Sequence, residues 1–171
     1  ERFVVHPDAM SDFTLTTERL ILRPWLPEDL APFSAMNADP RVMEFFPALM
    51  TLEETRTAIV TLGEKSAKYG FSFLAMTLKD TGEFIGFNGL NVPTFEAPFM
   101  PCVEIGWRIA FAHWGKGYAT EGARSALAHG FKSLGLKEIV SFAMVDNHRS
   151  LNVMEKIGMR KGFYRGVQQL P

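Results

Sequence analysis

The chain has 171 residues, 47% of them hydrophobic and fifteen of them phenylalanine, which is enough for one domain with a substantial core. Its 18 basic and 19 acidic residues give a formal net charge of −1, which excludes a general nucleic-acid-binding surface, and no apolar run is long enough to cross a bilayer. A single cysteine and the lack of a recognisable signal peptide favour the reducing cytoplasm, so we expect neither a membrane nor a nucleic-acid partner.

The start of the chain divides into a featureless stretch and a first strand. Residues 1–12 carry little pattern, and we expect them to be an N-terminal extension or a cloning remnant. A single domain is then expected over residues 13–171. Within it, residues 15–24 alternate in polarity and predict a strand that Pro24 ends.

Helical signals follow this strand. Pro27, with two acidic residues behind it, suits the first turn of a short helix, and residues 41–46 predict a turn or a second short helix. Thr51 and Glu54 form a capping box, so a longer helix is expected to run from there to about Lys68. The many aromatic and methionine side chains of this region suit either core packing or the wall of a pliable pocket.

The middle of the chain reads as a β-hairpin, a loop and a strand. Residues 71–78 and 83–90 are strand-like runs joined by a Lys-Asp-Thr-Gly turn. Three prolines within residues 91–101 argue against regular structure and predict a loop, which could border the substrate. Residues 102–109 then predict another strand.

The last third alternates helices and strands. Residues 118–134 predict a helix that Gly135 ends, residues 138–145 a strand, residues 146–157 a helix and residues 159–164 a final strand. A hairpin followed by strand, helix, strand, helix and strand indicates an α+β fold. We expect a mixed, mainly antiparallel central sheet with helices on both faces.

The most informative stretch is the turn between residues 102–109 and residues 118–134, where Gly115 and Gly117 alternate with other residues. Glycine lets the backbone approach a ligand closely, and the first amides of the following helix lack a carbonyl partner, so the turn predicts an anion site suited to phosphate. An ordinary glycine turn would explain the same pattern. The stretch lacks the Gly-Lys-Ser/Thr end of a P-loop and the Rossmann glycine pattern, which argues against ATP and NAD.

The remaining reactive residues form no recognisable site. The four histidines have no metal-ligand spacing and no Cys/His cluster exists, so no metal is expected. No G-x-S-x-G motif supports hydrolase chemistry. Cys102 is better explained as a buried structural thiol than as an acyl carrier.

The turn and its surroundings together resemble the GNAT superfamily of acetyl-CoA-dependent N-acyltransferases. The likeness rests on the sequences Trp-Gly-Lys-Gly-Tyr-Ala-Thr-Glu-Gly, Glu-Ile-Gly-Trp before it and Asn-His-Arg-Ser after it, and extends over residues 15–162. Within the superfamily it is greatest to the RimJ/RimL-type branch, named for ribosomal-protein N-terminal acetyltransferases. The resemblance implies the GNAT fold, acetyl-CoA as cosubstrate and an amine acceptor, either a protein N-terminus or a small molecule.

The resemblance also assigns the residues that bind acetyl-CoA. The family's diphosphate pattern begins at Trp114, which stands where Gln or Arg is usual. The backbone amides that would hold the diphosphate belong to Gly115, Gly117, Tyr118, Ala119 and Thr120. Lys116 would either add positive charge or be an ordinary surface lysine. Arg108 and Ile109 would pair through their backbones with the pantetheine arm, in a gap between their strand and the next.

The catalytic roles are implied in the same way. Glu104 would take a proton from the amine, directly or through water, unless it is an ordinary strand carboxylate. Asn147 would contact the pantetheine arm, although an N-cap role explains it equally well. Met154 stands where many members have a tyrosine acid, and Ser150 is the proton donor that the branch suggests instead.

These assignments imply direct acetyl transfer in a ternary complex. The alternative, favoured by the missing tyrosine, is a non-catalytic module that binds or senses acyl-CoA. No second apolar alternation follows Gly162, where family members usually continue into a final strand. An unpaired sheet edge there would favour association, so a homodimer is also expected.

Overall fold

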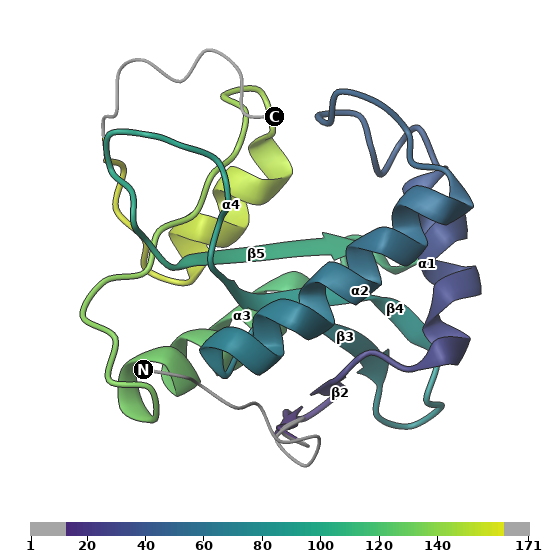
Figure 1. Cartoon of the computed structure of the whole chain (residues 1–171), viewed down its shortest axis with the longest axis horizontal. Coiled ribbons are helices and arrows are strands. Elements are labelled where there is room, and N and C mark those ends of the chain that lie inside the picture. The colour runs from purple at the N-terminus through teal and green to yellow at the C-terminus, as the bar shows by residue number, and fades with distance from the viewer. Residues whose placement is uncertain (1–12, 163–171) are drawn as a thin grey trace.

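The computed structural model describes residues 13–162, which form a sheet covered by helices (Figure 1). The described strands form one five-stranded sheet in the order β1-β2-β3-β4-β5, and every neighbouring pair is antiparallel. The strands are β1 (Leu15–Thr16), β2 (Leu20–Arg23), β3 (Phe73–Leu78), β4 (Phe84–Asn91) and β5 (Glu104–Ile109). The helices are α1 (Leu30–Asn37), α2 (Leu52–Tyr69), α3 (Tyr118–Lys132) and α4 (His148–Lys156), with short 3₁₀ turns η2 (Pro27–Asp29) and η3 (Phe111–His113).

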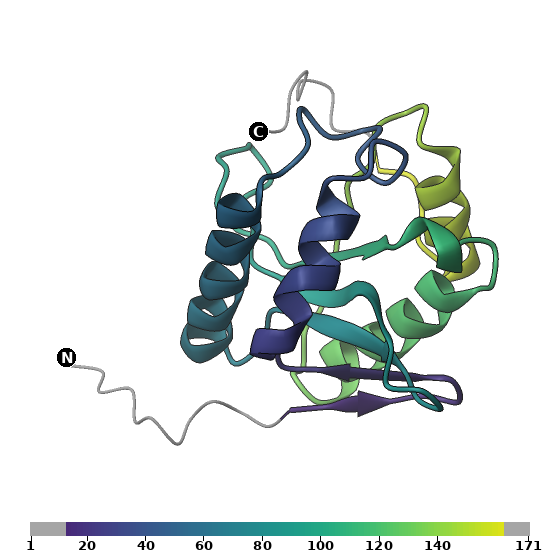
Figure 2. The ribbon, with the colours of Figure 1, turned by 90° about the vertical axis from the view of Figure 1, so that its right-hand side faces the viewer.

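Helices cover both faces of the sheet, as the sequence predicted. Helices α1 and α2 lie on one side, and α3 and α4 on the other (Figure 2). The alternation of β4 explains the two layers, because successive side chains point to opposite faces. Phe87 packs with Phe33 of α1, whereas Leu90 packs with Ala123 and Ala126 of α3.

Local sequence signals account for several element boundaries. The Thr51 hydroxyl accepts a hydrogen bond from the Glu54 amide at 3.2 Å, and the Glu54 carboxylate accepts one from the Thr51 amide at 2.6 Å. This reciprocal pair satisfies two amides that the first turn of α2 would leave free. The predicted capping box is therefore confirmed, and α2 starts directly behind it.

The strand expected over residues 138–145 is wrong beyond a single position. Val140 forms one parallel bridge with Glu104, in which its carbonyl accepts from the Ile105 amide at 2.8 Å. The next residue breaks the ladder, because the Ser141 hydroxyl donates to the Ile105 carbonyl at 2.9 Å in place of a backbone amide. The chain then leaves β5, so the two segments diverge.

The end of the chain is only partly described. Residues 159–162 do not form the strand that was expected over residues 159–164, and the remainder of that segment lies outside the described residues. The homodimer predicted from this end of the sheet therefore stays a prediction. None of the helices within residues 13–162 is long and apolar enough to cross a membrane.

Candidate functional site

The glycine turn has the geometry of an anion site. Gly115 and Gly117 have φ angles of 73° and 82°, in the left-handed region that favours glycine. Gly117 is the N-cap of α3, and its carbonyl accepts the first helical bond, from the Glu121 amide at 3.0 Å. The amides of Tyr118 to Thr120 thus have no acceptor within the helix, and their dipoles add positive potential at its end. They are free to hold an anionic group.

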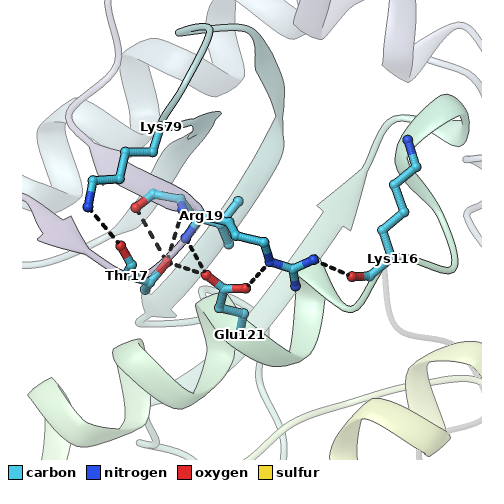
Figure 3. A network of polar contacts seen from close by, with 6 residues as sticks. Thr17, Arg19, Lys79, Lys116 and Glu121 are labelled. Atoms are coloured by element: carbon cyan, nitrogen blue, oxygen red, sulfur yellow. Dashed lines mark hydrogen bonds and ion pairs between the residues drawn. The ribbon is translucent and has the colours of Figure 1, made fainter.

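A polar network fixes this turn against the β1–β2 connection (Figure 3). The Glu121 carboxylate accepts hydrogen bonds from the Thr17 hydroxyl at 2.7 Å, the Arg19 amide at 2.8 Å and the Arg19 Nε at 2.7 Å. The other end of the guanidinium donates to the Lys116 carbonyl at 2.9 Å. Arg19 therefore ties the peptide between the two glycines to the first turn of α3. Sequence reasoning missed this contact, because Arg19 and Glu121 are 102 positions apart.

The edge of β5 is open beyond its single bridge to residue 140. Because the Ile105 amide points toward Val140, strand alternation turns the amides of Trp107 and Ile109 toward the same edge. The Ile109 carbonyl accepts from the Trp114 indole at 2.8 Å, but no described residue accepts from these two amides. This edge runs toward the glycine turn, so a ligand held at the turn could pair with the strand.

The side chains at positions 104 and 108 project from the face of β5 that α1 and α2 cover. The Glu104 carboxylate accepts a hydrogen bond from the Asn91 side-chain nitrogen at 2.6 Å, and Lys65 donates to the Asn91 side-chain oxygen at 3.0 Å. Burial raises the pKa of Glu104, and the Asn91 bond and the Lys65 charge offset part of this rise. A carboxylate with a raised pKa is a stronger base than an exposed one.

Arg108 reaches the same face with a largely buried guanidinium. Its Nη1 donates to the Asn37 side-chain oxygen at 2.7 Å, and the guanidinium lies 4.1 Å from the centre of the Phe46 ring and 5.3 Å from that of Phe87. Burial lowers the pKa of Arg108 to about 10. Strand alternation also turns its amide toward β4 and away from the open edge, as the neighbouring Ala110 amide, which bonds to β4, indicates.

The first turn of α4 lies beside the residue that precedes the glycine turn. The Arg149 guanidinium lies 4.2 Å from the centre of the Trp114 ring and pairs with Glu44 at 2.7 Å. Asn147 caps α4, since its side-chain oxygen accepts from the Ser150 amide at 3.2 Å. The Ser150 hydroxyl itself bonds to none of the described residues, so it is available to a ligand.

The predicted residues therefore form two groups around β5. The turn at residues 114–120, the β5 edge and the start of α4 lie together, whereas Glu104 and the Arg108 side chain lie on the α1 and α2 face. Burial raises the pKa of the Cys102 thiol, which donates a hydrogen bond to the Met100 sulfur at 3.4 Å. Residues 13–162 contain no cluster of metal-ligating side chains.

Comparisons with known proteins identify the family. The model of the acetyltransferase (GNAT) domain matches residues 19–160. The chain belongs to the GNAT acetyltransferase family. The Bacillus subtilis protein YkkB is 34% identical over 85% of this chain and 84% of its own length, and the B. subtilis N-acetyltransferase YnaD is 30% identical over 88% and 85%.

Solved structures of GNAT proteins share the fold. An acetyltransferase from Agrobacterium tumefaciens has a TM-score of 0.76 at 32% identity, over 92% of this chain and 88% of that one. The RimL ribosomal L7/L12 α-N-protein acetyltransferase, solved with coenzyme A, has a TM-score of 0.69 at 16% identity over 85% and 83%, a likeness of fold alone.

As a GNAT member the chain is an N-acetyltransferase, and its family uses acetyl-CoA as the acetyl donor. The residues present are chemically suited to that donor. Free amides at the start of α3 match a diphosphate, and the open amides of Trp107 and Ile109 match an arm built from amide groups.

Proposed function

We propose that the protein transfers the acetyl group of acetyl-CoA to a primary amine by direct attack within a ternary complex. The observation that carries the proposal is the open edge of β5, which leads to the free amides at the N-terminus of α3. A donor laid along this edge would present its reactive end between α4 and the face that bears Glu104. The donor would then lie along the edge of β5, and the acceptor would approach over the face that bears Glu104.

The donor is proposed to bind through backbone groups. The amides of Gly115, Gly117 and the first three residues of α3 would hold its diphosphate, with added charge from Lys116. Trp107 and Ile109 would pair with the pantetheine arm, because their amides face the open edge, whereas the amide of Arg108 faces β4. The Asn147 side-chain nitrogen, which its capping role leaves free, would contact the same arm.

The chain's own residues would move two protons. When bound, acetyl-CoA supplies a thioester carbon to which the amine nitrogen bonds as the carbon–sulfur bond breaks. An amine is mostly protonated at neutral pH, so Glu104, with its raised pKa, would accept a proton from it through water. An amide of the β5 edge would polarise the carbonyl oxygen, and the Ser150 hydroxyl would donate a proton to the departing sulfur.

Two classes of acceptor remain within the proposal. The RimJ/RimL-type likeness supports the α-amine of a protein N-terminus, and a small-molecule amine fits the same chemistry. The second candidate function is an acyl-CoA sensor without catalysis. It is favoured by Met154, which lies on α4 where the superfamily often has a proton-donating tyrosine.

Release of the CoA thiol tests the proposal. The protein is incubated with acetyl-CoA and a panel of short peptides and small amines, and the products are identified by mass spectrometry. Amine-dependent release with an acetylated amine supports the transferase. Tight binding of CoA without release above the rate of spontaneous hydrolysis, across the whole panel, would favour the sensor and contradict the transferase.

A further inference from the structure

Arg108 places a largely buried positive charge on the face of β5 where the acceptor is proposed to bind. The polar atoms that it reaches are the Asn37 side-chain oxygen at 2.7 Å and the Met50 sulfur at 3.9 Å, neither of which carries a charge. Its Nε is buried and has no hydrogen-bond partner. Among residues 13–162, no carboxylate forms an ion pair with it.

A buried guanidinium in this state lacks an opposite charge and acceptors for some of its N–H groups. Taking a charge out of water is costly unless an opposite charge and hydrogen bonds replace the water, and a guanidinium has five N–H groups to satisfy. The rings of Phe46 and Phe87 stabilise the cation in part through their π faces. These rings cannot accept hydrogen bonds from the remaining N–H groups as a carboxylate would, so the partner that the guanidinium lacks is an anion.

The nearest functional carboxylate does not fill this role. Glu104 lies on the same face of β5 but four residues away, which is about 13 Å along a strand. It is held by Asn91, with Lys65 as its neighbouring charge. Gly106 lies between these two residues, and the Phe73 ring packs over it, 2.9 Å from where a Cβ would be, so this ring separates Glu104 from Arg108. The face therefore offers a base at one end and an unpaired cation at the other.

The surroundings of Arg108 fix its position while leaving an approach from solvent. Asn37 is fully buried at the end of α1, and its side-chain nitrogen donates to the Thr55 hydroxyl of α2 at 3.2 Å. Its oxygen is thereby held toward the guanidinium. On the other side the cation is covered by Phe46, a residue that is 44% exposed. An acceptor that displaced or stacked on this ring would reach the guanidinium.

We propose that the acceptor amine carries a carboxylate and that Arg108 binds it, so that the enzyme selects acidic amines over their neutral counterparts. This inference rests on the proposed acetyl transfer to an amine. A flat carboxylate between the aromatic rings can accept two parallel hydrogen bonds from the guanidinium, which no neutral amine can do. The carboxylate belongs either to a free amino acid or to an acidic residue near a peptide N-terminus.

Matched acceptor pairs test the selectivity. Amino acids and their carboxamides form one arm, and peptides with Asp or Asn after the N-terminal residue form the other, with kcat/KM taken from thiol release. We expect the acid of the preferred arm to exceed its amide by about ten- to a hundredfold, the range for hydrogen bonds to a charged group. The arm in which this ratio appears identifies the source of the carboxylate.

Variants tie the selectivity to the guanidinium. Arg108→Gln should bring the acid-to-amide ratio close to one. Asn37→Asp is the sharper test, because it supplies a carboxylate to Arg108 from within the fold, while the Thr55 hydroxyl can donate to the new oxygen. It should lower the same ratio and raise the unfolding temperature. Arg56→Gln, at an exposed arginine on α2, is the control and should keep the wild-type ratio.

The outcomes separate this inference from the function on which it rests. Acetylation of amides and acids at equal rates by the wild type would overturn the carboxylate assignment and leave the transferase standing. A ratio that survives in Arg108→Gln would overturn the role of Arg108. Titration of an N-acetylated amino acid or peptide product against the CoA-bound protein gives a readout without turnover, and equal affinity for acid and amide products would likewise contradict the inference.

Discussion

Glu121 is predicted to stabilise both the fold and the donor site, and Glu121→Gln tests this. Its carboxylate accepts three hydrogen bonds, two of them from Arg19. A glutamine oxygen can keep the bonds to Thr17 and to the Arg19 amide. Its NH₂ group would then face the Arg19 Nε, a donor opposite a donor, so the charge-assisted bond is lost.

The cost follows from the exposure of the pair. A hydrogen bond to a charged group contributes about 1.5–3 kcal/mol when it is protected from solvent. The side chains of Arg19 and Glu121 are 44% and 18% exposed, so screening places the loss near the lower end. We expect about 1.5 kcal/mol of lost stability, which for a domain of this size lowers the unfolding temperature by about 3–6 °C.

A second effect of the same substitution concerns the donor. Without the Glu121 carboxylate, the Arg19 guanidinium is no longer directed to the Lys116 carbonyl, and the glycine turn loses its support from the β1–β2 connection. CoA should therefore bind several-fold more weakly. The assays are thermal unfolding and isothermal titration with CoA, and Glu18→Gln, at the exposed neighbouring carboxylate, is the control.

The pH dependence gives an independent check. Burial raises the pKa of Glu121, but its hydrogen bonds with Thr17 and Arg19 lower it by more, so the folded pKa lies below the unfolded one. The stability from this group is present above the unfolded pKa and is lost as pH falls through the folded pKa. The difference between wild type and Glu121→Gln should shrink in acid. Equal unfolding temperatures for Glu121→Gln and Glu18→Gln at neutral pH would refute the reasoning.

Two further predictions concern the proton transfers. Lys65→Met removes a charge that lowers the pKa of Glu104, so the acidic limb of the kcat/KM profile should move to higher pH. Glu104→Gln should remove that limb and lower kcat by about 10²–10⁴-fold. An unmoved limb in Lys65→Met would contradict Glu104 as the base. Ser150→Ala keeps the amide that Asn147 caps, so kcat should fall without a change in the KM for acetyl-CoA. An unchanged kcat, with chemistry shown to be rate-limiting, would exclude Ser150 as the proton donor.

Local sequence signals predicted the elements that depend on neighbouring residues. The capping box at Thr51 and Glu54, the N-cap role of Asn147 and the hairpin between β3 and β4 are each formed within a few positions. Their energetics are local, so the sequence contains the whole signal. The glycine turn belongs to the same class, since its left-handed φ angles need only glycine at positions 115 and 117.

Contacts between distant segments could not be predicted in this way. The segment at residues 138–145 has the composition of a strand, but the Ser141 hydroxyl takes the place of the next backbone bond to β5. Arg108 was expected to act through its backbone, yet its side chain is the more informative part, because Asn37 and two rings from other elements surround it. Backbone amides alternate in direction along β5, and counting from the bridge to Val140 places the amide of Trp107, and not that of Arg108, at the open edge.

Binding of CoA to matched glycine variants tests the central claim most directly. Gly117 and Gly82 both have left-handed φ angles, 82° and 72°, so alanine at either position carries a similar backbone strain of about 1–2 kcal/mol. Only Gly117→Ala would relieve this strain by turning the free amides of α3 away from the donor. Isothermal titration should show CoA affinity reduced by about ten- to a hundredfold in Gly117→Ala, as expected for the loss of a hydrogen bond to a charged group, and near wild type in Gly82→Ala. Wild-type affinity in Gly117→Ala would contradict the placement of the donor on this turn.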